Sequence, residues 1–227
     1  MNVAAVARAR DTHVFLLVVL AVLAAGLLWF IRQKIHYVTD YSLDSYTDYY
    51  WPRRAGLILH LLGGVLAICA GLVQIWLGLT HRTGKLHRRL GKVYAAGVLI
   101  GSLGGFYLAL TISGHLAYRA GLFALATAWV LTTGMALYSI RTRRIEQHRE
   151  WMLRSYTVTF AFVTFRLVAS ALRSWLHMPD SPDVDEVDSL MAWACWAVPL
   201  LVAEPLIQLR SMRRLAGNRA PRQSVPV

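Results

Sequence analysis

Acidic residues are scarce in this chain: 12 Asp and Glu stand against 24 Lys and Arg in 227 residues, a formal net charge of +12. Charged residues make up only 16% of the sequence, whereas 56% is hydrophobic and the mean hydropathy is +0.45. A composition this apolar argues against a soluble domain and is typical of a protein that crosses a membrane several times.

Cysteine is equally rare. The two cysteines, Cys69 and Cys195, lie far apart inside apolar segments and support neither a disulfide framework nor a zinc site. The chain also lacks a P-loop, a nucleophile elbow and a His-Glu-x-x-His pair. Hydrolytic chemistry therefore has little support, and the sequence assigns no enzyme class.

Six apolar segments are long enough to cross a hydrocarbon core of about 30 Å. They lie at roughly residues 13–31, 55–79, 91–112, 120–140, 154–176 and 189–209. The first ends in Trp29-Phe30-Ile31 without a small-residue cleavage site, which indicates a retained span rather than a signal peptide. We therefore predict an all-α, six-span helix bundle that forms a single membrane domain over 1–216, followed by a disordered basic tail at 217–227.

Basic and acidic residues alternate between the predicted loops. The N-terminus, the 80–92 and 141–154 segments and the chain after 209 carry 2, 5, 5 and 5 basic residues, which is 17 of the 24. Acidic residues gather instead at 40–48 and 180–188. By the positive-inside rule, both termini should be cytoplasmic. The basic side should contact anionic lipid headgroups, and we expect no nucleic-acid partner.

His60 lies in an otherwise apolar segment, where an ionisable ring usually has a partner or a task. Gly64, Gly71 and Gly78 fall on roughly the same helical face. Such a glycine track allows close approach by another helix or by a flat cofactor.

Four histidines are candidate haem ligands. His60 and His115 lie at the outer ends of the second and fourth segments, and His87 and His148 at the inner ends of the third and fifth. Facing imidazoles are suited to axial ligation of a b-type haem, whose iron would be the only metal bound. Arg88 and Arg149 are candidate propionate partners. The order resembles the four-helix core of transmembrane dihaem b-type cytochromes, although histidines at segment ends are also common without a cofactor.

Arg166 is the most deeply placed charge in the predicted bundle. It follows His148 by eighteen residues, which puts both on one helical face. A mid-membrane arginine rarely faces lipid, so it should point into the bundle or a wet cavity. Three roles remain open: fixing helix packing, binding an anion, propionate or quinone, or forming an ion path with Glu204. Gln74 is a further polar candidate for such a network.

Three elements together resemble a known family: His60-Leu-Leu-Gly-Gly64, His87-Arg-Arg-Leu-Gly91 and His148-Arg-Glu-Trp-Met152 with Arg166. The chain is similar, over roughly residues 55–170, to the uncharacterised bacterial membrane proteins grouped as domain of unknown function 2306. The resemblance implies a multi-pass protein of the bacterial inner (plasma) membrane and supplies no activity. His115 is not part of the family pattern.

These observations lead to three hypotheses. The first is a haem b protein of membrane electron transfer, with a redox partner or quinone. The second is a non-redox transporter or channel-like protein with a polar cavity around His60, Gln74, Arg166 and Glu204. The third is a structural accessory subunit whose glycine faces pack against a partner.

Overall fold

The computed structural model describes residues 21–22, 24–29, 31–80, 82–177 and 186–219, and in these ranges it contains helices and no strand. Residues 21–34 are helical where described. Short helices α2 (His36–Thr39), α3 (Leu43–Tyr50) and η1 (Trp51–Arg53) lead into the long ones. The long helices are α4 (Arg54–Leu79), α5 (Lys85–Thr111), α6 (Leu116–Arg141), α7 (Ile145–Trp175) and α8 (Glu186–Arg219).

Within the described ranges, four stretches are long and apolar enough to cross a membrane: Leu43–Gly78, Lys85–Thr111, Leu116–Arg141 and Glu186–Arg214. α7 adds a fifth if its two parts, Ile145–Ala161 and Val163–Trp175, which meet at a 45° bend, form one span. These five match the second to sixth predicted segments. Most of the first segment lies outside the described residues, so six spans and cytoplasmic termini stay predictions.

The helices extend further than hydropathy alone predicts. α5 begins at Lys85, α7 begins at Ile145, and α8 continues through Arg219 into the segment predicted as a tail. The rest of that predicted tail lies outside the described residues.

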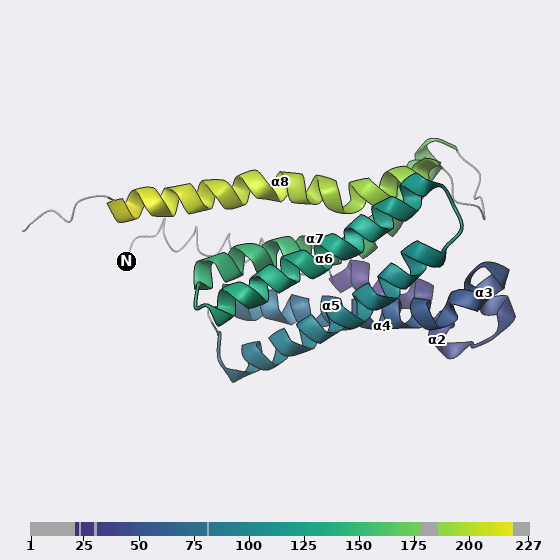
Figure 1. Ribbon diagram of the computed structural model, residues 1–227, viewed down its shortest axis with the longest axis horizontal. Coiled ribbons are helices and arrows are strands. Elements are labelled where there is room, and N and C mark those ends of the chain that lie inside the picture. The colour runs from purple at the N-terminus through teal and green to yellow at the C-terminus, as the bar shows by residue number, and fades with distance from the viewer. Residues whose placement is uncertain (1–20, 23, 30, 81, 178–185, 220–227) are drawn as a thin grey trace, which may run out of the picture.

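The long helices are arranged in layers. Figure 1 shows α6 and α7 between α8 on one side and α4 and α5 on the other. α2 and α3 lie beside the first turns of α4, at the end where α5 finishes. We call this the tyrosine-rich end, after Tyr37, Tyr41, Tyr46, Tyr49 and Tyr50. The opposite end, where the 80–84 and 142–144 turns lie, is called the basic end.

Glycines bring α4 and α5 into backbone contact. A Cβ atom added to Gly63 would lie 2.2 Å from the Gly101 nitrogen, and one added to Gly104 would lie 2.5 Å from the His60 nitrogen. Neither position could hold a side chain without separating the helices. The three glycines of the predicted face differ: Gly64 lies against Gly101 of α5, Gly71 lies against the Tyr156 ring of α7, and Gly78 meets nothing within 4 Å.

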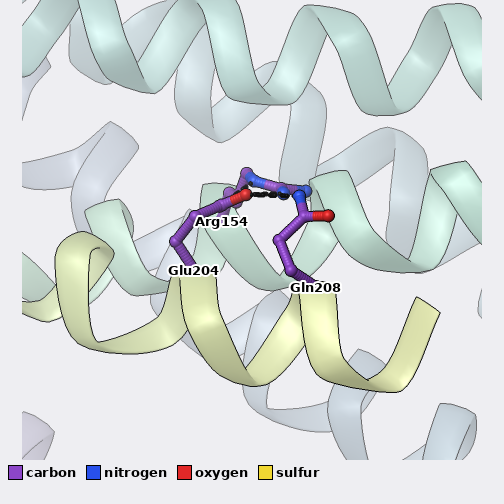
Figure 2. A network of polar contacts seen from close by, with 3 residues as sticks. All are labelled: Arg154, Glu204 and Gln208. Carbon is purple, nitrogen blue, oxygen red and sulfur yellow. Dashed lines mark hydrogen bonds and ion pairs between the residues drawn. The ribbon is translucent and has the colours of Figure 1, made fainter. Parts of the chain in front are cut away.

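Among the described residues, three ion pairs hold α8 against α7, and one of them joins Arg214 to Glu146 at the start of α7. Near the basic end, the Arg154 guanidinium donates to both carboxylate oxygens of Glu204 at 2.9 and 2.7 Å, and Gln208 donates to the same carboxylate at 2.7 Å (Figure 2). Near the tyrosine-rich end, Arg173 pairs with Asp188 at 2.9 Å. Glu204 thus serves to attach α8, and its partner is Arg154 rather than Arg166.

Substituting Gly63 by alanine should destabilise the protein, because the added methyl group meets the α5 backbone rather than a movable side chain. We expect a loss of about 1–3 kcal/mol, measured as a lower unfolding temperature in detergent. Gly78→Ala in the same helix is the matched control and should not be destabilised, since its Cβ enters open space. Equal melting temperatures for the two variants would contradict this packing.

Candidate functional site: a cationic cavity in the bundle

A cavity of about 130 Å³ lies among α4, α5, α6 and α7 and is bordered by residues 34, 37 and 50. Most of its wall is apolar, from leucines on α4, α5 and α6 and from Phe165 on α7. Its polar lining residues are Lys34, Tyr37, Tyr50, His60, Ser102, Tyr118 and Arg166. An apolar pocket with a few converging polar groups is the usual form of a ligand site.

Three of these polar residues come from different helices but lie at a similar depth. His60 is 6 residues from the start of α4, while Ser102 and Arg166 are each 9 residues from the ends of α5 and α7. At a rise of about 1.5 Å per residue, all three lie about 9–14 Å from the helix ends at the tyrosine-rich end. The antiparallel order of the helices therefore gathers them at one level of the bundle.

His60 is held by the neighbouring helix. Its Nδ1–H donates to the Gly101 carbonyl oxygen across 2.9 Å, because a carbonyl can only accept. In the neutral ring this places the lone pair on Nε2. Gly105 provides space for the ring, since a Cβ there would lie 3.2 Å from Nδ1.

The inner boundary of the cavity is a buried tryptophan supported by hydroxyl groups. Trp129 is 1% exposed, and its indole N–H donates to Thr159 Oγ1 at 2.7 Å. The Tyr94 hydroxyl bonds Thr159 at 2.8 Å and Ser155 at 2.6 Å, and Thr133 bonds Ser155 at 2.7 Å. These side chains connect α5, α6 and α7 and fix the position of the indole.

The charged residues that line the cavity in the described part of the chain are positive. They are Lys34 and Arg166, and no Asp or Glu is among the described lining residues. Burial and the nearby positive charge of Arg166 lower the pKa of Lys34 to about 8. The carboxylate of Asp188 lies close enough to Tyr118, a lining residue, to interact with it electrostatically. This carboxylate is already paired with Arg173. The cavity is therefore a site of uncompensated positive potential.

Besides the two cations without an acidic neighbour in the described cavity lining, the cavity has a buried hydroxyl group, that of Ser102, without a hydrogen-bond partner among the described residues. The residue is 1% exposed, and its Oγ has no hydrogen-bond partner in the part of the chain that the structure describes. A serine in a helix commonly bonds a backbone carbonyl one turn earlier. A buried hydroxyl without a partner is costly, which makes Ser102 a candidate contact for a group that the described residues do not supply.

The predicted inner histidines lie at the basic end. His148 Nδ1–H donates to the Ala136 carbonyl at 2.9 Å, and His87 lies close enough for the two rings to interact electrostatically. His87 Nδ1 is buried and has no hydrogen-bond partner among the described residues. The side-chain amide of Gln74 donates to the His87 carbonyl oxygen. The same amide lies beside Gly91, where a Cβ added to the glycine would be 3.2 Å from the amide nitrogen.

The remaining predicted residues lie elsewhere. His115 is exposed immediately before α6 and does not line the cavity with His60. Arg149 pairs with Glu146 at 3.0 Å. Arg88 lines an open groove with Lys85, Arg89 and Lys92. Of the four residues expected around one polar cavity, His60 and Arg166 share it, whereas Gln74 and Glu204 do not.

Sequence reasoning missed Lys34, Ser102 and Tyr118 as lining residues. Tyr37 and Tyr50 were not predicted as lining residues either. A usable signal was the position of Ser102 within Gly101-Ser-Leu-Gly-Gly105, the glycine-rich stretch that faces His60. Across the described ranges, no group of three or more His, Cys, Asp or Glu side chains could hold a metal ion.

The helices and their apolar lengths define a multi-pass, all-helical membrane protein. The family model of predicted membrane proteins named DUF2306 matches residues 57–207, so the chain belongs to that family. The match covers α4 to α7 and most of α8, including the cavity residues on these helices. No curated protein and no solved structure matches the chain.

The hydroxyl groups below the cavity should contribute to stability as a unit. Thr159→Val removes the acceptor of the Trp129 indole and one partner of Tyr94, and should cost about 1–3 kcal/mol. Thr157→Val, two residues away, is the control because Thr157 is partly exposed and its hydroxyl bonds the Leu153 carbonyl of its own helix. Thermal unfolding in detergent compares the two; a Thr159→Val protein as stable as its control would show that the network is dispensable.

Proposed function

We propose that this protein binds a small ligand within the membrane, in the cavity between α4 and α7, as a transporter or channel-like protein would. The observation that carries the proposal is the convergence of Arg166, His60 and the unpartnered Ser102 on one cavity. A cavity of about 130 Å³ is small beside the roughly 300–1,000 Å³ of pockets for drug-sized molecules. This size favours a small ligand over a porphyrin beside His60.

The proposed location is the bacterial inner membrane, with the basic end facing the cytoplasm. The positive-inside rule supports this orientation. The groove of Lys85, Arg88, Arg89 and Lys92 would then meet anionic headgroups of the inner leaflet. Ligand would enter from the tyrosine-rich end, where Tyr37, Tyr50 and Tyr118 line the cavity.

Cysteine labelling tests access to the cavity. In a background in which Cys69 and Cys195 are replaced by alanine, Ser102→Cys should react with the impermeant anionic reagent 2-sulfonatoethyl methanethiosulfonate added from the tyrosine-rich side. Ser139→Cys is the control, because Ser139 is also 1% exposed but does not line the cavity. Equal, negligible modification of both positions, read by mass spectrometry, would reject an accessible intramembrane site.

A second candidate function is electron transfer through an inner haem b, in exchange with a redox partner or quinone. It is favoured by the buried, unpartnered His87 Nδ1 beside His148, whose Nδ1 bond to Ala136 leaves Nε2 as the ligating atom. These two rings would bind the iron, Arg88 and Arg149 would contact the propionates, and the haem would supply one-electron chemistry. The contact between Gly91 and Gln74 would have to open to admit a porphyrin.

Absorption spectra decide this second candidate. Protein purified after haem-replete expression should show a Soret band and a reduced-minus-oxidised difference spectrum. His87→Ala and His148→Ala should lose both, while His115→Ala, at an exposed position away from both rings, should keep them. A wild-type protein without a Soret band would reject the haem function and leave the cavity proposal untouched.

A further inference from the structure

The charge of the cavity lining indicates the charge of the ligand that would fill it. Two cationic side chains, Lys34 and Arg166, line a space whose other walls are largely hydrocarbon. Like charges in one site repel each other, and burial in addition deprives Lys34 of water. An anion between them would relieve both penalties, whereas a cation or a neutral molecule would relieve neither.

The donor groups also match an oxyanion. Arginine presents parallel N–H groups that fit a carboxylate in a two-point contact, and lysine acts as a point charge. Among the described residues, no hydrogen bond or ion pair engages the guanidinium of Arg166, which lies over the Phe165 ring at 5.4 Å and is exposed at a position that lines the cavity. Ser102 adds a buried O–H whose donor capacity is unused.

The apolar walls of the cavity favour a ligand whose remaining part, beyond the anionic group, is hydrocarbon. Leu57 and Leu61 on α4, Leu108 on α5 and Phe165 on α7 offer packing surface and no hydrogen bonds from their side chains. A strongly hydrated inorganic ion would leave its outer oxygens facing hydrocarbon, at a desolvation cost. A short hydrocarbon chain or ring attached to the anionic group would instead bury apolar surface.

Deepening the proposed function, on which this inference rests, we propose that the cavity binds a small organic monocarboxylate. Its carboxylate pairs with Arg166 and Lys34 and accepts a hydrogen bond from Ser102, and its hydrocarbon part packs against the leucines and Phe165. The volume of about 130 Å³ suits a body of a few carbon atoms rather than a long acyl chain. Phospholipid headgroups are excluded on the same ground.

Direct binding to the purified, full-length protein in nanodiscs tests this assignment. Radiolabelled butyrate should bind saturably, and benzoate should compete. Butyramide, of nearly the same size but neutral, and butylammonium should not compete at the same concentration. A long-chain fatty acid should also fail, which separates a free small acid from a lipid-derived carboxylate.

Variants locate the binding site. Arg166→Gln should weaken butyrate binding about tenfold or more, and Arg166→Lys should weaken it less because the charge remains. Ser102→Ala should weaken it several-fold. The controls are Arg119→Gln, the same change at an arginine that caps α5 outside the cavity, and Ser139→Ala, at an equally buried serine elsewhere. Melting temperatures and size-exclusion profiles check that each variant is folded.

The inference is overturned if wild-type protein does not bind butyrate saturably, if butyramide competes equally, or if the cavity variants bind like their controls. Its failure is distinct from failure of the proposed function. Labelled Ser102→Cys without carboxylate binding would leave an accessible cavity that takes another ligand. If Ser102→Cys is not labelled, the proposal of an accessible intramembrane site is itself rejected.

Discussion

The backbone contact between α4 and α5 is the constraint on which the site depends. With Gly63, Gly101 and Gly104 at the crossing, the two helices lie closer than side chains would allow. That distance lets the His60 ring reach the Gly101 carbonyl. It also lets the Trp129 ring pack at Gly101, since a Cβ there would lie 3.0 Å from the indole. One wall of the cavity and its inner boundary therefore both follow from the absence of side chains on one helix face.

Polar groups in this bundle fall into two kinds. Thr159, Ser155, Thr133 and Tyr94 satisfy one another, and Arg154 is satisfied by Glu204. These groups hold helices together and require nothing else. The hydroxyl of Ser102 has no partner among the described residues, and the cations Lys34 and Arg166 lie over the aromatic rings of Tyr37 and Phe165 rather than beside a carboxylate. Because unsatisfied polar groups in a membrane protein are expensive, this contrast separates residues that stabilise the fold from the residues of the proposed ligand site.

Much of the helical architecture could be predicted from the sequence, because length and hydropathy report directly on the hydrocarbon core. The extra turns of α5 from Lys85 and of α7 from Ile145 could not, since hydropathy marks only the apolar part of a helix. His60 and Arg166 could be singled out, because ionisable residues in apolar segments are rare. Ser102 could not: serine in a membrane helix normally bonds its own backbone, and only the packing around it shows that its hydroxyl has no partner. The separation of Glu204 from Arg166 also required the structure, because it depends on how α8 lies against α7.

The bend in α7 separates the anchored part of this helix from the part that lines the cavity with Arg166. On one side of the 45° bend, residues up to Ala161 are anchored to α5 and α6 through Ser155 and Thr159. On the other side, the segment from Val163 carries Arg166 and ends near the ion pair of Arg173 with Asp188. The bend therefore sets the angle at which the second part, and with it Arg166, meets the anchored half of the helix. The shape of the cavity on this side is a property of that bend as well as of the residues that line it.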